Sequence, residues 1–201
     1  MAKKATTTKR KVVEVPVNNS RYATPKKAIV PEKNNKEELL KAISFYQQDI
    51  NIDSNISNEC LTDEQKKCVE TLDKAMCPLS EMILTQVTIA SAIDVYKKQA
   101  DVKNITDLVG KTLINVPFMS TTKRPFEEVI KRRYDMGIGQ PVCILIHTNE
   151  KLKGLDVEIE TEKKDAKQEI ILARNQQFLV KRVEIANGCG ETYPILHFYA
   201  G

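Results

Sequence analysis

The residue pattern of this 201-residue chain changes at Pro78, and no other feature constrains the fold as strongly. Before Pro78, apolar residues recur at intervals of three and four, which predicts one helix from Asn35 to Ile50 and another from Thr62 to Met76. Gln65 follows Thr62 at the spacing that marks a helix N-terminus. Residues 51–59 are polar, so we expect a loop between the two helices.

Beyond Pro78 the chain consists of short segments rich in β-branched residues, which predict strands. Two helical segments interrupt them, one from Ile89 to Gln99 and one that begins at Arg124, with a proline in its first turn. Asn187-Gly188 predicts the turn of the last hairpin. Helices first and strands afterwards indicate an α+β fold rather than alternating βαβ units. The expected strands are 82–90, 112–119, 141–148, 157–160, 169–173, 177–185 and 193–199.

Charge divides the chain unevenly. Residues 1–36 contain ten Lys and Arg against two Glu, whereas the rest of the chain carries a net charge of −4. A segment with so much charge and so few apolar residues is typical of a solvated tail, or of an arm that binds an acidic partner such as nucleic acid or a protein assembly. We therefore expect an extended or disordered basic arm at 1–34 and a domain at 35–201, with a helical part at 35–77 and a β-rich part at 78–201.

The composition argues against several classes of site and location. The five cysteines include no Cys-x-x-Cys pair, so we interpret them as reduced thiols. The only histidines, His147 and His197, stand far apart in sequence, and we expect no metal site. No apolar run is long enough for a membrane helix, and no signal-peptide pattern is present. We expect a protein without a membrane segment, either cytoplasmic or associated with a particle such as a virion and delivered into a host.

Two motifs in the β-rich part are more specific than the composition. Residues 118–122 read Phe-Met-Ser-Thr-Thr, and residues 168–172 read Gln-Glu-Ile-Ile-Leu. The first resembles the Ser-Thr-Ser motif of the mono-ADP-ribosyltransferases of phages and bacterial toxins, and the second resembles their Glu-containing strand. Because both motifs occur in the order of that family, with strands between them, the resemblance extends over residues 78–201. It implies a two-sheet β core behind the N-terminal helices.

The resemblance also implies a reaction. Enzymes of this family cleave the nicotinamide–ribose bond of NAD and transfer ADP-ribose to a protein acceptor. Glu169 corresponds to the catalytic carboxylate, which would bind the ribose as positive charge develops on it, and Ser120 to the serine that steadies this carboxylate. Thr121, Thr122 and Phe118 would line the NAD site.

Two positions depart from the family pattern. Gln86 falls where the family has an Arg that holds the NAD diphosphate, and a neutral amide cannot replace a bidentate charged contact. Lys97, Lys98 or Arg124 would have to supply the missing charge. Lys167 falls where the family has the acceptor-facing Glu or Gln. A lysine there would repel an arginine acceptor, so another group, or water, is the expected acceptor.

Three functional interpretations follow. The first is an NAD-dependent mono-ADP-ribosyltransferase that modifies a protein. The second is a catalytically degenerate structural or interaction protein, for example a phage virion component anchored by the basic arm, and Gln86 and Lys167 favour it. The third is a nucleic-acid binder that acts through the arm alone, whose affinity would fall steeply with salt.

Overall fold

The computed structural model describes residues 33–49, 51–135, 141–161, 168–188 and 191–201. The described part of the chain begins with three helices: α1 (Lys33–Gln48), α2 (Ile52–Ser57) and α3 (Asp63–Ala75). Helices α1 and α3 pack together through buried apolar residues that include Ile43 and Leu72. The predicted start of α3 is confirmed, because the Thr62 hydroxyl accepts a hydrogen bond from the Gln65 backbone N–H at 3.2 Å.

Helix α2 corrects the expectation of a loop at residues 51–59. Ile52 and Ile56 lie one helical turn apart and are only 2% and 5% exposed. Their burial against α1 and α3 stabilises a short helix that the polar residues around them conceal in the sequence.

Within the described residues, nine strands form a sheet in the order β1-β6-β7-β4-β2-β5-β9-β8-β3. The pair β5–β9 is parallel and the other pairs are antiparallel. Strands β2 and β4 join at the single pair Thr85–Thr122, so the sheet consists of two halves, β1-β6-β7-β4 and β2-β5-β9-β8-β3. The α+β class with N-terminal helices is confirmed, and the expected two-sheet core corresponds to these halves. The strands are β1 (Cys77–Pro78), β2 (Ile83–Ile89), β3 (Thr112–Asn115), β4 (Met119–Thr122), β5 (Pro141–His147), β6 (Lys153–Asp156), β7 (Glu169–Leu172), β8 (Gln176–Gly188) and β9 (Glu191–Ala200).

Further helices lie between the strands: α4 (Ala90–Ala100), the 3-10 turn η1 (Ile105–Leu108), α5 (Phe126–Asp135) and α6 (Val157–Thr161). Helix α6 occupies residues for which a strand was predicted. That prediction was wrong because β-branched residues alone do not make a strand: Val157 and Ile159 would share one face of a strand, yet Val157 is buried and Ile159 is 63% exposed.

The last hairpin also differs from its prediction. Asn187-Gly188 is not itself the turn, because Gly188 still pairs with Glu191 in the β8–β9 ladder. Asn187 still belongs to the ladder, opposite Thr192, whose hydroxyl donates to the Asn187 side chain at 2.9 Å.

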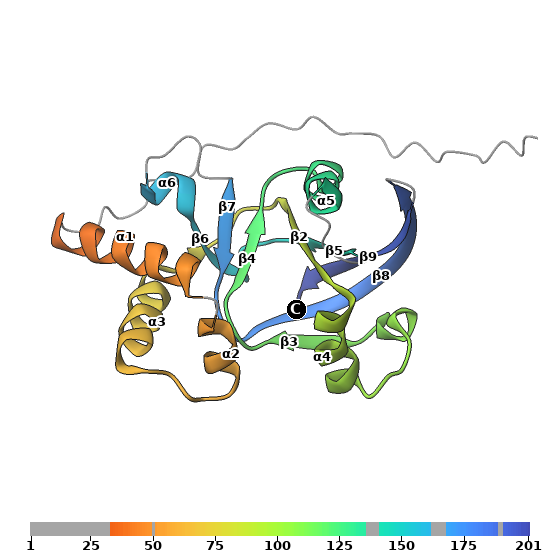
Figure 1. Ribbon diagram of the computed structural model, residues 1–201, viewed down its shortest axis with the longest axis horizontal. Helices are drawn as coiled ribbons and strands as arrows, with labels where there is room; N and C mark the ends of the chain where they lie inside the picture. The colour runs from red at the N-terminus through yellow and green to blue at the C-terminus, as the bar shows by residue number, and fades with distance from the viewer. Residues whose placement is uncertain (1–32, 50, 136–140, 162–167, 189–190) are drawn as a thin grey trace, which may run out of the picture.

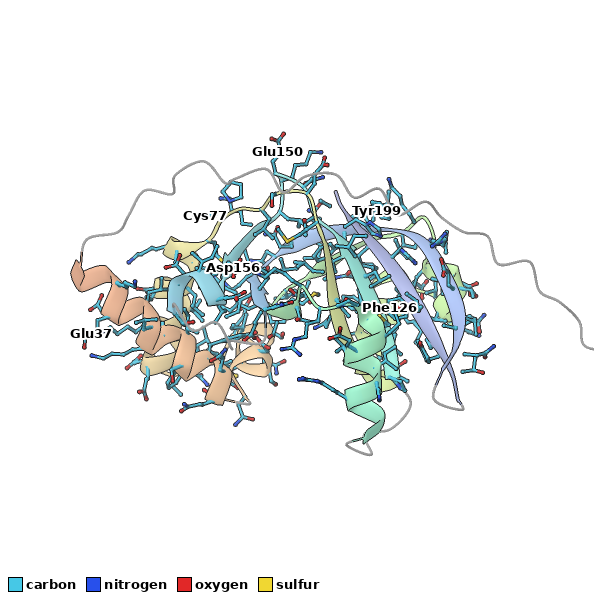
Figure 2. All side chains as sticks on the ribbon, turned by 90° about the horizontal axis from the view of Figure 1, so that it is seen from above. Glu37, Cys77, Phe126, Glu150, Asp156 and Tyr199 are labelled. Atoms are coloured by element: carbon cyan, nitrogen blue, oxygen red, sulfur yellow. The ribbon has the colours of Figure 1, made fainter. Side chains whose placement is uncertain are left out.

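The two faces of the sheet have different coverings. One face encloses the largest apolar cluster, to which Leu84 of one half and Met119 of the other both belong, with α4 packed against it. On the opposite face, α1 and α3 cover the half around Ile171, and α5 covers the half around Val87 (Figure 1). Figure 2 shows α1 and α5 on the same side of the sheet. Motif strand β4, which pairs with β7 on one side, meets β2 on the other, at the boundary between the half covered by α1 and α3 and the half covered by α5.

Candidate functional site

The two sequence motifs converge on neighbouring strands. Strands β4 and β7 are antiparallel, with Ser120 opposite Ile171 and Thr122 opposite Glu169. Because side chains alternate along a strand, Ser120, Thr122 and Glu169 lie on one face. The Ser120 hydroxyl donates a short hydrogen bond to Oε1 of Glu169. The structure therefore brings together the serine and the glutamate that the resemblance singled out.

A third residue, which the motifs do not contain, completes this contact. The Gln47 amide at the end of α1 donates from Nε2 to Oε2 of Glu169 at 2.6 Å. Each carboxylate oxygen thus accepts one hydrogen bond, one from the sheet and one from the helical part. An ionised carboxylate has about four acceptor positions, so about two remain for the hydroxyl groups of a ligand.

The other motif residues have structural partners. Thr121 is 4% exposed and donates to the Ile170 carbonyl at 2.7 Å, which ties β4 to β7 on the face away from Glu169. Thr122 accepts from the Arg124 backbone N–H at 3.2 Å. Phe118 is 2% exposed and meets the Tyr46 ring edge-on, with ring centroids 5.5 Å apart. Thr121 and Phe118 therefore hold the strand that carries Ser120 in place, and they expose little surface to a ligand.

The structure does not bring Gln86 to Ser120 and Glu169. Its neighbour Thr85 is the residue that pairs with Thr122, so Thr85 lies on their face of the sheet and Gln86 on the opposite one. Lys167, the expected acceptor-facing residue, lies outside the described residues.

Two of the lysines that could supply charge to a ligand already have a carboxylate partner. Lys97 pairs with Asp94 at 2.6 Å, and Lys123 pairs with Asp156 at 2.9 Å. Arg124 differs from them, because its Nε is buried and has no hydrogen-bond partner among the described residues. A buried N–H without an acceptor is unfavourable, so an anionic ligand that reached Arg124 would satisfy this group.

Next to Gln47 in α1, Tyr46 forms a hydrogen bond with the carboxylate of Asp53. The Tyr46 hydroxyl donates to Oδ2 of Asp53 at 3.3 Å, while Oδ1 of Asp53 is buried without a partner among the described residues. Burial raises the pKa of Asp53 from 3.8 to about 6. Burial also raises the pKa of Tyr46, and the nearby carboxylates of Asp53 and Glu169 raise it further. Tyr46 therefore remains a neutral hydrogen-bond donor close to the site.

Other kinds of site are less well supported within the described residues. No three His, Cys, Asp or Glu side chains there converge as ligands of a metal ion, and no helix there is long and apolar enough to cross a membrane. A surface hollow beside Leu79 and Asn149 is lined by residues 79–81 and 149–151, and none of the motif residues contributes to it.

Comparison with known proteins bears on the fold. No protein-family model and no curated protein matches the sequence. Among solved structures, the chain is similar to Plx2a, an ADP-ribosyltransferase toxin from Paenibacillus larvae, with a TM-score of 0.59, 13% identity, and coverage of 84% of this chain and 86% of that one. The C3 exoenzyme of Clostridium limosum gives a TM-score of 0.55 and 16% identity, over 83% and 85% of the two chains.

This chain has the ADP-ribosyltransferase fold. The enzymatic component C2-I of the Clostridium botulinum C2 toxin, with a TM-score of 0.59 and 17% identity, is also similar, and the match spans 81% of this chain but only 43% of C2-I. The resemblance inferred from the two motifs is thus confirmed at the level of the fold. Identities this low establish architecture alone, and the activity must be argued from the site.

Proposed function

We propose that the protein is an NAD-dependent mono-ADP-ribosyltransferase that modifies a protein acceptor. The observation that carries the proposal is the Glu169 carboxylate, held by Ser120 at the junction of β4 and β7 in an ADP-ribosyltransferase fold. Glu169 keeps acceptor positions for ribose hydroxyls and has no cation paired with it among the described residues, so its charge is available to a substrate.

The proposed reaction breaks the bond between ribose C1′ and the nicotinamide nitrogen. The electron pair of that bond leaves with nicotinamide, which becomes neutral, and positive charge develops on the ribose. A nucleophilic atom of the acceptor then bonds to C1′ and releases its proton to solvent. Glu169 would hold a ribose hydroxyl more strongly as the ring becomes positive, which favours the transition state over the bound substrate.

Coulomb's law gives the size of the stabilisation that the Glu169 carboxylate provides to the positive ribose. A carboxylate about 4 Å from a unit positive charge, at an effective dielectric constant of about 20, contributes about 4 kcal/mol. This corresponds to about a thousandfold in rate. We therefore expect Glu169→Gln to lower kcat/KM for nicotinamide release by about a thousandfold while the protein remains folded.

The test uses the full chain with NAD, a bacterial lysate as acceptor source, and chromatographic detection of nicotinamide. Glu150→Gln is the matched control, because Glu150 is an exposed glutamate outside the motif strands. Label from the adenine half of NAD should appear on protein with the wild type and the control but not with Glu169→Gln. Absence of turnover together with absence of binding at millimolar NAD would refute the proposal.

A second candidate is a protein that keeps the fold without turning over NAD. The orientation of Gln86 favours it, because neither its charge nor its direction suits a diphosphate. Calorimetry separates the two candidates: an enzyme binds NAD and releases nicotinamide, whereas the degenerate protein does neither. A partner recognised through the basic arm would be lost on deletion of residues 1–32, with the folded part intact.

A further inference from the structure

The Glu169 carboxylate is held from two directions. Ser120 contacts Oε1 from β4, and Gln47 contacts Oε2 from α1 at 2.6 Å, across 122 positions of sequence. The terminal torsion of a glutamate is broad, so a single donor leaves the carboxylate free to turn. Two donors on different oxygens fix both its position and its plane.

Apolar packing holds α1 in the place from which Gln47 reaches Glu169. The adjacent Tyr46 is 7% exposed, and its ring meets Phe118 on the chain segment that leads into β4. One turn earlier, Ile43 is 1% exposed and belongs to the same apolar cluster as Ile171 of β7. The last two turns of α1 are therefore fixed against the strands that carry Ser120 and Glu169.

Buried polar contacts fix the end of α1 from the other side. Gln65 of α3 is 4% exposed and donates to Asp49, just after α1, at 2.7 Å. Its carbonyl oxygen accepts from Asn55 of α2 at 2.9 Å and from the Thr62 backbone N–H at 3.0 Å. A satisfied buried amide of this kind ties the three helices into one unit.

From these contacts we infer that Gln47 is a positioning residue for Glu169, and that the helical part of the domain thereby belongs to the catalytic apparatus. The inference rests on the proposed function. A neutral amide suits this role because it restrains the carboxylate without cancelling its charge. A lysine in its place would form an ion pair with Glu169 and oppose the positive charge that develops on the ribose.

Kinetics of nicotinamide release test the inference with three variants. Gln47→Leu removes the donor, Gln47→Lys keeps a donor but adds a positive charge, and Gln48→Leu is the control. Gln48 is the next residue of α1, is exposed, and bonds only to Ser44 of its own helix among the described residues.

A hydrogen bond to a charged group is worth roughly tenfold to a hundredfold in an equilibrium or a rate. We expect kcat to fall by that factor for Gln47→Leu and at least as far for Gln47→Lys. KM for NAD should change less than about twofold for Gln47→Leu and should stay equal or fall for Gln47→Lys, because a cation attracts the NAD phosphates. Gln48→Leu should match the wild type, and all three variants should melt close to it.

Two outcomes would overturn the inference. One is a kcat for Gln47→Leu equal to that of Gln48→Leu. The other is full activity in Gln47→Lys, which would show that the carboxylate does not need a neutral donor at this position. A wild type without NAD turnover or binding would instead refute the proposed function, so the two failures are distinguishable.

A measurement without NAD examines the contact itself. In a nitrogen–proton correlation spectrum, Glu169→Gln should shift the side-chain amide signals of Gln47 and leave those of Gln48 in place. Unmoved Gln47 signals would show that the contact does not persist in solution and would overturn the inference.

Discussion

Asp53 offers the most quantitative test of the helical part. Its carboxylate has one buried oxygen without a partner among the described residues, and burial raises its pKa from 3.8 to about 6. Because each pKa unit is worth about 1.4 kcal/mol, ionised Asp53 destabilises the fold at pH 7 by at most about 3 kcal/mol. Partial exposure and the favourable position of a carboxylate at the start of α2 reduce this figure. We expect Asp53→Asn to raise the free energy of unfolding at pH 7.5 by about 1–2 kcal/mol.

The stability gained by Asp53→Asn depends on pH. A carboxyl with a raised pKa in the folded state stabilises the fold below its unfolded pKa, and this stability is lost as the pH rises through the folded value. The advantage of Asp53→Asn should therefore be largest above pH 6 and shrink towards pH 4.

Urea unfolding at pH 7.5 and pH 4.5 measures both quantities. Asp101→Asn is the control, because Asp101 is exposed and its left-handed backbone, with φ of 53°, suits asparagine as well as aspartate. A variant at Asp53 that is less stable than the wild type at pH 7.5, or that gains equally at both pH values, would contradict the reasoning.

Three further predictions use the same preparations. Arg124→Gln should raise KM for NAD about tenfold or more with little effect on melting temperature, since a charged hydrogen bond to phosphate is lost; an unchanged KM would show that Arg124 does not contact NAD. Thr62→Ala should lower the free energy of unfolding by about 1 kcal/mol, measured in urea, because α3 loses its N-cap. Burial lowers the pKa of His147 and of His197. The free energy of unfolding should therefore be highest above pH 6.5 and should fall below that pH, because the unfolded chain takes up protons more readily than the folded one. Equal melting temperatures of the wild type and a His147→Asn/His197→Asn double variant at pH 7.5 and 5.5 would argue against this last prediction.

Much of the site could be predicted because two motifs mark neighbouring strands. Ser120 ends an apolar segment and Glu169 begins one, and antiparallel pairing of such segments brings the two side chains together. Gln47 could not be found in this way. A glutamine on an exposed helix face produces no periodic pattern, and its partner lies across 122 positions of sequence.

Local sequence patterns are insufficient where tertiary packing decides which way a residue faces or which element forms. The family pattern predicts Gln86 in the NAD site, and in the structure strand alternation turns Gln86 to the face opposite Ser120 and Glu169 and leaves Thr85 beside Thr122. The β-branched residues around Ile159 suggested a strand, yet the chain forms a short helix there and leaves that side chain exposed. A local pattern shows neither outcome, because each depends on how the segment packs in the fold.

The single residue pair between β2 and β4 has a mechanical consequence. Backbone hydrogen bonds make each half of the sheet stiff. The two halves are held together mainly by apolar side chains that pack in one cluster, Leu84 from one half and Met119 and Leu172 from the other. Such contacts have no preferred direction, so a small sliding movement breaks few directional bonds. Glu169, Ser120 and Gln47 lie on one side of this seam, and α5 covers the other side. The two halves can therefore slide against each other at this seam while the contacts of Ser120 and Gln47 with Glu169 stay intact.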